Sequence, residues 1–163
     1  MTRLDTVIER LKAQRSCLNA AAEALCGQVG HILELGLGNG RTYDHLRHLF
    51  PDRDIYVFDM EVASHPDCRP DAAHLFLGPM SETLPAAANR LGPRAVLVHA
   101  DIGYGDTAAT ARNVTGLGPK IPPLLASGGL VLCDQPLDAV PGLSPAPLPA
   151  DVEPGRYHAY RRD

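Results

Sequence analysis

The chain has 163 residues, 45% of them apolar and 21% charged, enough for one domain with a substantial core and too few for two. Its 15 basic and 19 acidic residues give a net charge of −4 with the signs interspersed, so neither nucleic acid nor an anionic membrane is the expected partner. No signal-peptide core or membrane-length apolar run occurs, and the four cysteines form no CxxC pair, so we expect a reduced, cytoplasmic protein.

The first predicted element is an amphipathic helix over residues 3–28. Its apolar side chains recur at helical spacing, at Leu4, Val7, Ile8, Leu11, Leu18, Ala22 and Leu25. Gln14 and Arg15 interrupt this stripe where inward-facing apolar residues are expected. Because a buried arginine is costly unless it is paired, Arg15 is expected either to form a surface salt bridge or to reach a ligand from above the sheet, a role that Gln14 could share.

Five short apolar segments follow, separated by helical stretches. The segments are residues 31–36, 54–59, 74–78, 95–101 and 129–134. The intervening helices are expected over residues 41–49, from near Ser81, and from about Asp106 to the break at Gly116–Pro119. Apolar strands without alternation are typical of a parallel sheet covered on both faces. We therefore predict an α/β fold with three layers and an open, mostly parallel sheet.

The residues after 135 differ in composition, with six prolines between 136 and 154. Such a segment leaves little room for regular structure, so we expect a loop that ends in a short edge strand within residues 155–162. The whole chain, residues 1–163, is predicted to be one domain. Its parts are the N-terminal helix 3–28, a core over residues 30–135 and the tail over residues 136–163.

The first strand leads into HILELGLGNGR, residues 31–41. A loop at this place lies at the carboxyl edge of a parallel sheet, where open α/β folds bind ligands. A Walker phosphate loop is excluded because GxxxxGK(S/T) does not occur. A dinucleotide loop, GxGxxG, is disfavoured because its third glycine would fall on Arg41. The remaining pattern is E-x-G-x-G-x-G, formed by Glu34, Gly36, Gly38 and Gly40.

This pattern resembles the first motif of the class I S-adenosylmethionine-dependent methyltransferases. The resemblance extends over residues 30–135, and the string ELGLGNGRTYDHLR is most similar to a small family of stand-alone methyltransferases. It implies a Rossmann-like fold, S-adenosylmethionine as the cofactor and methyl transfer as the activity. It also implies an antiparallel hairpin at the C-terminal edge of the sheet, which we predict to be reduced here to one strand over residues 156–161.

The implied cofactor carries an ammonium and a sulfonium and no phosphate. The carboxylate of Glu34 suits those positive charges, and bare glycines let the loop approach the methionine part closely. Asp59, at the end of the second strand, is expected to hold the two ribose hydroxyls, with Glu61 as the alternative. The resemblance places the adenine beside Met80 and Ser81. The expected cofactor contacts are Arg15, Glu34, Gly36, Gly38, Asn39, Gly40, Arg41, Asp59, Met80, Ser81 and Asp101.

At the reacting end, methyl transfer requires two positioned reactants and a group that takes a proton when the acceptor is a hydroxyl. Asp101 ends the fourth strand, His99 lies on the same strand face, and Tyr104 follows in the loop. We therefore predict Asp101, His99 and Tyr104 as the catalytic residues.

The resemblance also raises the question of magnesium. Relatives of the catechol and macrolide types bind the ion through an acid after the fourth strand and an Asp-Asn or Asp-Asp pair after the fifth. The matching residues are Asp101, Asp134 and Gln135, and such oxygen ligands suit a hard divalent ion. Because Gln135 departs from the pair and Gly103 stands where a second acid is expected, magnesium is the less favoured alternative and no metal site is predicted.

The methyl acceptor is not identified by any motif. The chain nearly ends after the fifth strand, so the acceptor pocket must be completed by the N-terminal helix, the tail or another subunit; a homo-oligomer, most simply a dimer, is expected. On charge grounds we favour a small-molecule acceptor, methylated on oxygen or nitrogen. Two alternatives stay open: a catalytically silent S-adenosylmethionine-binding protein or subunit, and an NAD-dependent oxidoreductase, which Arg41 disfavours.

Overall fold

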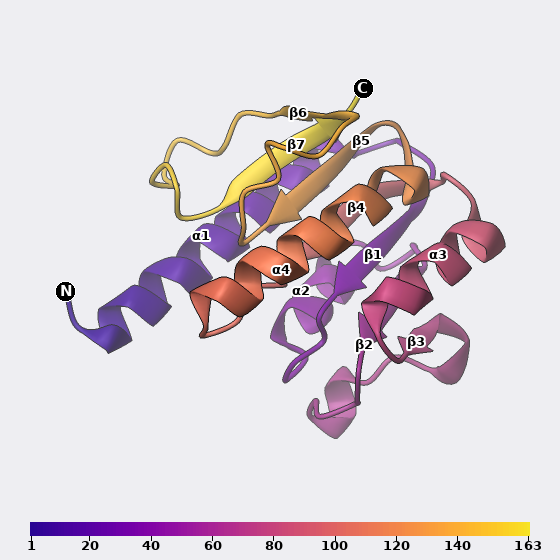
Figure 1. The fold of residues 1–163 in the computed structure, drawn as a ribbon, viewed down its shortest axis with the longest axis horizontal. Helices are drawn as coiled ribbons and strands as arrows, with labels where there is room; N and C mark the ends of the chain where they lie inside the picture. The colour runs from indigo at the N-terminus through magenta and orange to yellow at the C-terminus, as the bar shows by residue number, and fades with distance from the viewer.

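A seven-stranded sheet forms the centre of the computed structural model, which describes residues 1–163 (Figure 1). The strands are β1 (His31–Leu35), β2 (Ile55–Asp59), β3 (Leu75–Leu77), β4 (Ala95–Ala100), β5 (Leu125–Cys133), β6 (Leu143–Pro145) and β7 (His158–Arg162). Their order is β3-β2-β1-β4-β5-β7-β6, with β1 to β5 parallel and β7 antiparallel to β5. The predicted open, mostly parallel Rossmann-like sheet is confirmed.

Helices cover both faces of this sheet. They are α1 (Arg3–Ala24), α2 (Arg41–Leu49), α3 (Met80–Leu91) and α4 (Thr107–Leu117). The first two pack with one face of the sheet around one buried apolar cluster, and the other two pack around a second cluster on the opposite face. β4 is buried along its whole length because it is covered from both sides. None of the helices has the length and apolar character that crossing a membrane requires.

Helix α1 starts as predicted and ends early. Thr2 and Asp5 form a reciprocal capping box at its start. The helix ends at Ala24 rather than at residue 28, because Leu25 caps it and Gly27 turns the chain with a φ of 78°. Its N-terminal half extends past the carboxyl ends of the parallel strands (Figure 1).

The proline-rich tail contains a strand that the sequence analysis missed. β6 pairs antiparallel with β7, so the C-terminal edge of the sheet has two strands and the prediction of a single edge strand was wrong. Pro145 lies opposite Tyr160 in this pair. A proline is tolerated there because β6 is the outermost strand, where no further ladder needs its missing N–H.

The strand order places a ligand crevice at one edge of the sheet. β1 lies between β2 and β4, so the crossover connections from β1 and β4 leave in opposite directions and their carboxyl ends flank an opening. The loop after β1, the end of β2 and the end of β4 all meet at this edge. The residues predicted to bind a ligand are concentrated in these three places.

Candidate active site

A cavity of about 610 Å³ opens at this edge. Its volume is within the range of small-molecule sites. Nine residues predicted from the sequence line it: Gly36, Gly38, Asn39, Arg41, Asp59, Met80, Ser81, Asp101 and Tyr104. Four other predicted residues, Arg15, Glu34, Gly40 and His99, do not line it. The cavity also has walls that the sequence analysis did not assign, notably Arg10 and Asn113.

Two positions of the loop after β1 require glycine because nearby atoms leave no room for a side chain. Gly36 has a φ of 96°, and a Cβ there would lie 2.7 Å from the carbonyl oxygen of Asp101. Gly40 has a φ of 86°, and its Cβ would lie 2.5 Å from the Cβ of Cys68. Only glycine meets both demands at these positions. Gly40 therefore serves the turn into α2 and does not line the cavity; its predicted contact with the cofactor stays a prediction.

Asp59 fixes the geometry of the glycine loop. Its Oδ2 atom accepts hydrogen bonds from the backbone N–H groups of Leu37 at 2.8 Å and Gly38 at 3.1 Å. Its Oδ1 atom accepts one from the N–H of Met60 at 2.6 Å. The carboxylate thus stands on the cavity wall and ties the end of β2 to the loop after β1. Glu61, the alternative to Asp59, is exposed and lies outside the wall.

Asp101 stands on the opposite side of the crevice and forms an ion pair. The Nη1 atom of Arg10 lies 3.2 Å from its Oδ2 atom, and both side chains are about one-third exposed. Helix α1 therefore supplies a cavity wall, whereas no residue of the tail does. The sequence carried a usable signal for Arg10, because it precedes Gln14 by one helical turn and so shares its face.

The remaining wall combines apolar surface with hydrogen-bonding groups. Met80 and Ser81 begin α3, directly after β3, as predicted for the adenine side. Tyr104 is largely exposed at the mouth. Asn113 of α4 donates from Nδ2 to the carbonyl oxygen of Ile102 at 2.8 Å, which holds the loop after β4.

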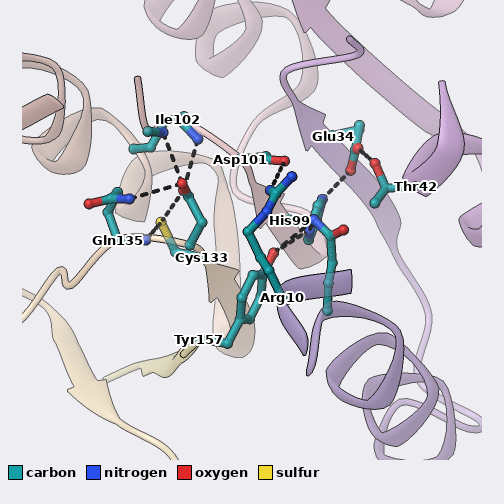
Figure 2. A network of polar contacts seen from close by, with 12 residues as sticks. Arg10, Glu34, Thr42, His99, Asp101, Ile102, Cys133, Gln135 and Tyr157 are labelled. Carbon is teal, nitrogen blue, oxygen red and sulfur yellow. Dashed lines mark hydrogen bonds and ion pairs between the residues drawn. The ribbon is translucent and has the colours of Figure 1, made fainter. Parts of the chain in front are cut away.

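Glu34 and His99 are buried and do not line the cavity. Figure 2 shows the polar contacts that they form. The Nδ1 atom of His99 is 2.6 Å from Oε2 of Glu34, and neither side chain is exposed. Oε1 of Glu34 accepts a hydrogen bond from the hydroxyl of Thr42. On the other side, Nε2 of His99 lies 2.5 Å from the hydroxyl of Tyr157. The structure thus does not place Glu34 against a ligand or His99 at a reacting atom.

This buried pair determines the ionisation of His99. Burial lowers the pKa of His99, but the charge and hydrogen bond of Glu34, together with the charges of Asp101 and Asp134, outweigh it and raise the pKa above its ordinary value. The buried imidazole is therefore biased toward its charged form. It serves to hold other side chains in place.

Of the two residues that interrupt the stripe of α1, only one faces inward. Gln14 is buried and lines the cavity, whereas Arg15 is exposed. Arg15 therefore does not line the cavity, and its predicted contact with the ligand stays a prediction. The apolar stripe continues through Leu18, Ala21 and Leu25, and a residue at position 14 lies on this face, while position 15 is rotated away by about 100°.

The residues matched to a magnesium site already form hydrogen bonds or ion pairs within the protein. Both oxygens of Asp134 accept backbone hydrogen bonds, Oδ1 from Ile102 and Oδ2 from Gly103. Oδ2 also accepts from Nε2 of Gln135 at 2.9 Å. No three carboxylate, imidazole or thiol side chains are grouped in a way that could hold a metal ion. Asp101, Asp134 and Gln135 therefore do not fit a magnesium site.

A doubly wound sheet, an E-x-G-x-G-x-G loop after its first strand and an acid at the end of its second strand define a Rossmann-like methyltransferase. Comparison with known proteins agrees. A family described as S-adenosyl-L-methionine methyltransferase matches residues 1–162. The chain belongs to this family of S-adenosylmethionine-dependent methyltransferases.

Solved structures give the same result. A crystal structure of an S-adenosyl-L-methionine methyl transferase from Silicibacter pomeroyi DSS-3 is 45% identical, with a TM-score of 0.94, and the match covers 100% of this chain and 99% of that one. A putative caffeoyl-CoA O-methyltransferase from Staphylococcus aureus shares the fold at 14% identity and a TM-score of 0.59, covering 89% and 81%. MycE methyltransferase of the mycinamycin pathway also shares the fold, with 20% sequence identity and a TM-score of 0.52. The match covers 80% of this chain and 34% of that one. No curated protein matches.

Proposed function

We propose that the cavity binds S-adenosylmethionine and that its methyl group is transferred to an oxygen or nitrogen atom of a small-molecule acceptor. One observation carries this proposal. The glycine loop, Asp59 and the Met80–Ser81 turn line one continuous cavity, and Asp101 and Tyr104 complete its wall. A single cavity can therefore take the cofactor on one side and an acceptor on the other.

The cofactor fits the donor set of the first side. The backbone of Gly36 and Gly38 accommodates the methionine part at close approach. The carboxylate of Asp59 lines the cavity and keeps acceptor capacity beside its three backbone hydrogen bonds for a ribose hydroxyl, and Met80 gives the adenine a polarisable apolar contact. When bound, S-adenosylmethionine supplies an electrophilic methyl group on a sulfonium.

The chain's own residues position the acceptor and receive its proton. Transfer breaks the sulfur–methyl bond and forms an oxygen–methyl or nitrogen–methyl bond, and the acceptor atom loses a proton. Asp101 is the carboxylate within reach of that side of the cavity, so we assign it the proton. Arg10, paired with Asp101, holds the carboxylate in place and closes the cavity from above. The phenol of Tyr104 stands at the mouth to contact the acceptor.

Cavity size and charge favour a small acceptor. A cavity of about 610 Å³ holds the cofactor and one modest molecule. The net charge of −4 disfavours nucleic acid. The fold accommodates a small acceptor elsewhere, since MycE has been crystallised with SAH and mycinamycin VI.

The test is to incubate the protein with methyl-labelled S-adenosylmethionine and separated fractions of a cell extract. We expect label in the low-molecular-weight fraction, and a fall of about a hundredfold or more in Asp101→Asn. Asp52→Asn, exposed at the opposite edge of the sheet, is the matched control and keeps its activity. Label confined to macromolecules contradicts the acceptor class. Tight binding without any transfer indicates a silent binding protein instead.

We also propose that the partner is a second copy of this chain, docked on the exposed N-terminal part of the apolar stripe of α1. Leu4, Val7 and Ile8 are exposed there, on a helix that projects beyond the sheet (Figure 1). The same helix continues into the cavity wall at Arg10 and Leu11. A second α1 packed antiparallel across a twofold axis would cover these apolar side chains beside both cavities.

A further inference from the structure

Gln14 connects the cavity to the buried polar residues beneath it. Its side chain is 4% exposed and lines the cavity. Its Nε2 atom lies 3.3 Å from Nε2 of His99 and 3.5 Å from the hydroxyl oxygen of Tyr157. The amide nitrogen therefore points into the protein.

The contact with Tyr157 orients this amide. Tyr157 can donate its proton to a neutral His99 or accept one from a charged His99, at 2.5 Å. In both cases the Tyr157 oxygen keeps a lone pair for Gln14, whose Nε2 only donates. The His99 ring is itself fixed by Glu34 at 2.6 Å. These contacts connect Gln14 to Tyr157, Tyr157 to His99 and His99 to Glu34. Thr42 donates a hydrogen bond to the other oxygen of Glu34.

The other end of the amide is free. Oε1 of Gln14 has no hydrogen-bond partner in the protein, and it is not among the fully buried atoms that lack one. It is therefore an accessible acceptor on a residue that lines the cavity, next to Gly36 and Thr42. A polar atom fixed in this way suits a donor on a ligand.

The donor follows from what Glu34 does. Both of its oxygens are used internally, by Thr42 and His99, and its side chain has no exposed surface, so the acid of the glycine motif offers nothing to the ammonium group of the methionine part. Side-chain acceptors in the cavity wall include Oε1 of Gln14 and the carboxylate of Asp101, and Asp101 is already paired with Arg10. An amide oxygen forms a charge-assisted hydrogen bond with an ammonium group.

We propose that Oε1 of Gln14 binds the ammonium group of S-adenosylmethionine, and that Tyr157, His99 and Glu34 are positioning residues that hold the amide for it. The assignment rests on the proposed function of the cavity. It also gives the tail a role, because Tyr157 precedes β7 and orients a residue of α1 at the site.

Calorimetry with three ligands tests the assignment. S-adenosylhomocysteine carries the ammonium and carboxylate groups, its decarboxylated analogue carries only the ammonium, and 5′-methylthioadenosine carries neither. We expect Gln14→Leu to weaken the first two by about tenfold or more and to leave 5′-methylthioadenosine unchanged. Arg15→Ala, one residue along the same helix and exposed, is the control and should bind all three like the parent.

Tyr157→Phe tests the positioning role while it keeps the aromatic ring. We expect the dissociation constants of both ammonium-bearing ligands to rise several-fold and that of 5′-methylthioadenosine to stay unchanged, whatever the change in melting temperature. Equal losses for all three ligands, or unchanged binding in Gln14→Leu, overturn the assignment while S-adenosylhomocysteine binding still supports the cavity. If the parent protein binds none of the three, the proposed function fails and this assignment fails with it.

Discussion

The imidazole of His99 and the carboxylate of Glu34 lie 2.6 Å apart, and neither has any exposed surface. They come from adjacent parallel strands, β4 and β1, at matched positions in the register. Removing one partner of a buried pair leaves the other charged and uncompensated in a low dielectric, which costs far more than the intact pair contributes. This pair therefore stabilises the sheet at the place where the ligand cavity opens.

Glu34→Ala should lower the free energy of unfolding by about 3–5 kcal/mol, because it leaves His99 buried without its counter-charge. Urea denaturation followed by circular dichroism measures the change. Glu23→Ala, an exposed acid on α1, is the control and should stay within about 0.5 kcal/mol of the parent. A loss of less than about 1 kcal/mol in Glu34→Ala would show that the pair is not buried as described.

The same pair predicts a pH dependence of stability. The pKa of His99 is raised above 6.5 in the folded state, so folding binds protons. Its contribution is complete below about pH 6.5 and is lost as the pH rises through the folded-state pKa. The reference is the double variant Glu34→Gln/His99→Gln, in which neither group titrates. The stability gap between parent and double variant should shrink as the pH rises above about 6.5. A gap that widens would show that burial lowers this pKa.

Methyl transfer should not depend on magnesium. Both Asp134 oxygens are held by backbone hydrogen bonds, and no group of three carboxylate, imidazole or thiol side chains is arranged around one point for an ion. We expect unchanged turnover after treatment with a chelator, and no saturable heat when magnesium is titrated into the protein. Activity that vanishes with the chelator and returns with the ion would contradict this geometry.

The exposed N-terminal part of the apolar stripe of α1 predicts a dimer. Ile8→Glu places a charge in the exposed apolar stripe and should convert the dimer to a monomer in light scattering, with little change in melting temperature. Lys12→Glu, on the same helix outside this stripe, controls for the added negative charge. A parent protein that is monomeric at all concentrations would contradict the proposed interface.

The open, mostly parallel sheet and the cavity position could be predicted because periodicity and composition carry them. Apolar segments without alternation indicate strands covered on both faces, and a glycine loop after the first of them lies at the ligand edge. Asp59, Met80 and Asp101 follow from their places at strand ends. Each of them lines the cavity.

The roles of Glu34 and His99 could not be predicted, because they depend on pairing across the sheet. Their positions align in the register of β1 and β4, which no local pattern reveals. Tyr157 joins them from the far end of the chain. The choice between Gln14 and Arg15 depended on a helical phase of one residue, and β6 was hidden by prolines that only an edge strand tolerates.

The most direct test of cofactor binding by this cavity is a calorimetric titration of the parent protein with S-adenosylhomocysteine and with NAD. The titration is repeated on Asp59→Ala. Because the cavity is proposed to bind S-adenosylmethionine, we expect saturable binding of S-adenosylhomocysteine and no binding of NAD. We expect Asp59→Ala to weaken the binding free energy of S-adenosylhomocysteine by about 1.5–3 kcal/mol, because the variant removes an anionic hydrogen-bond acceptor from the cavity wall. An unchanged dissociation constant in Asp59→Ala would move the ribose contact to Glu61. Saturable binding of NAD without binding of S-adenosylhomocysteine would contradict the account as a whole.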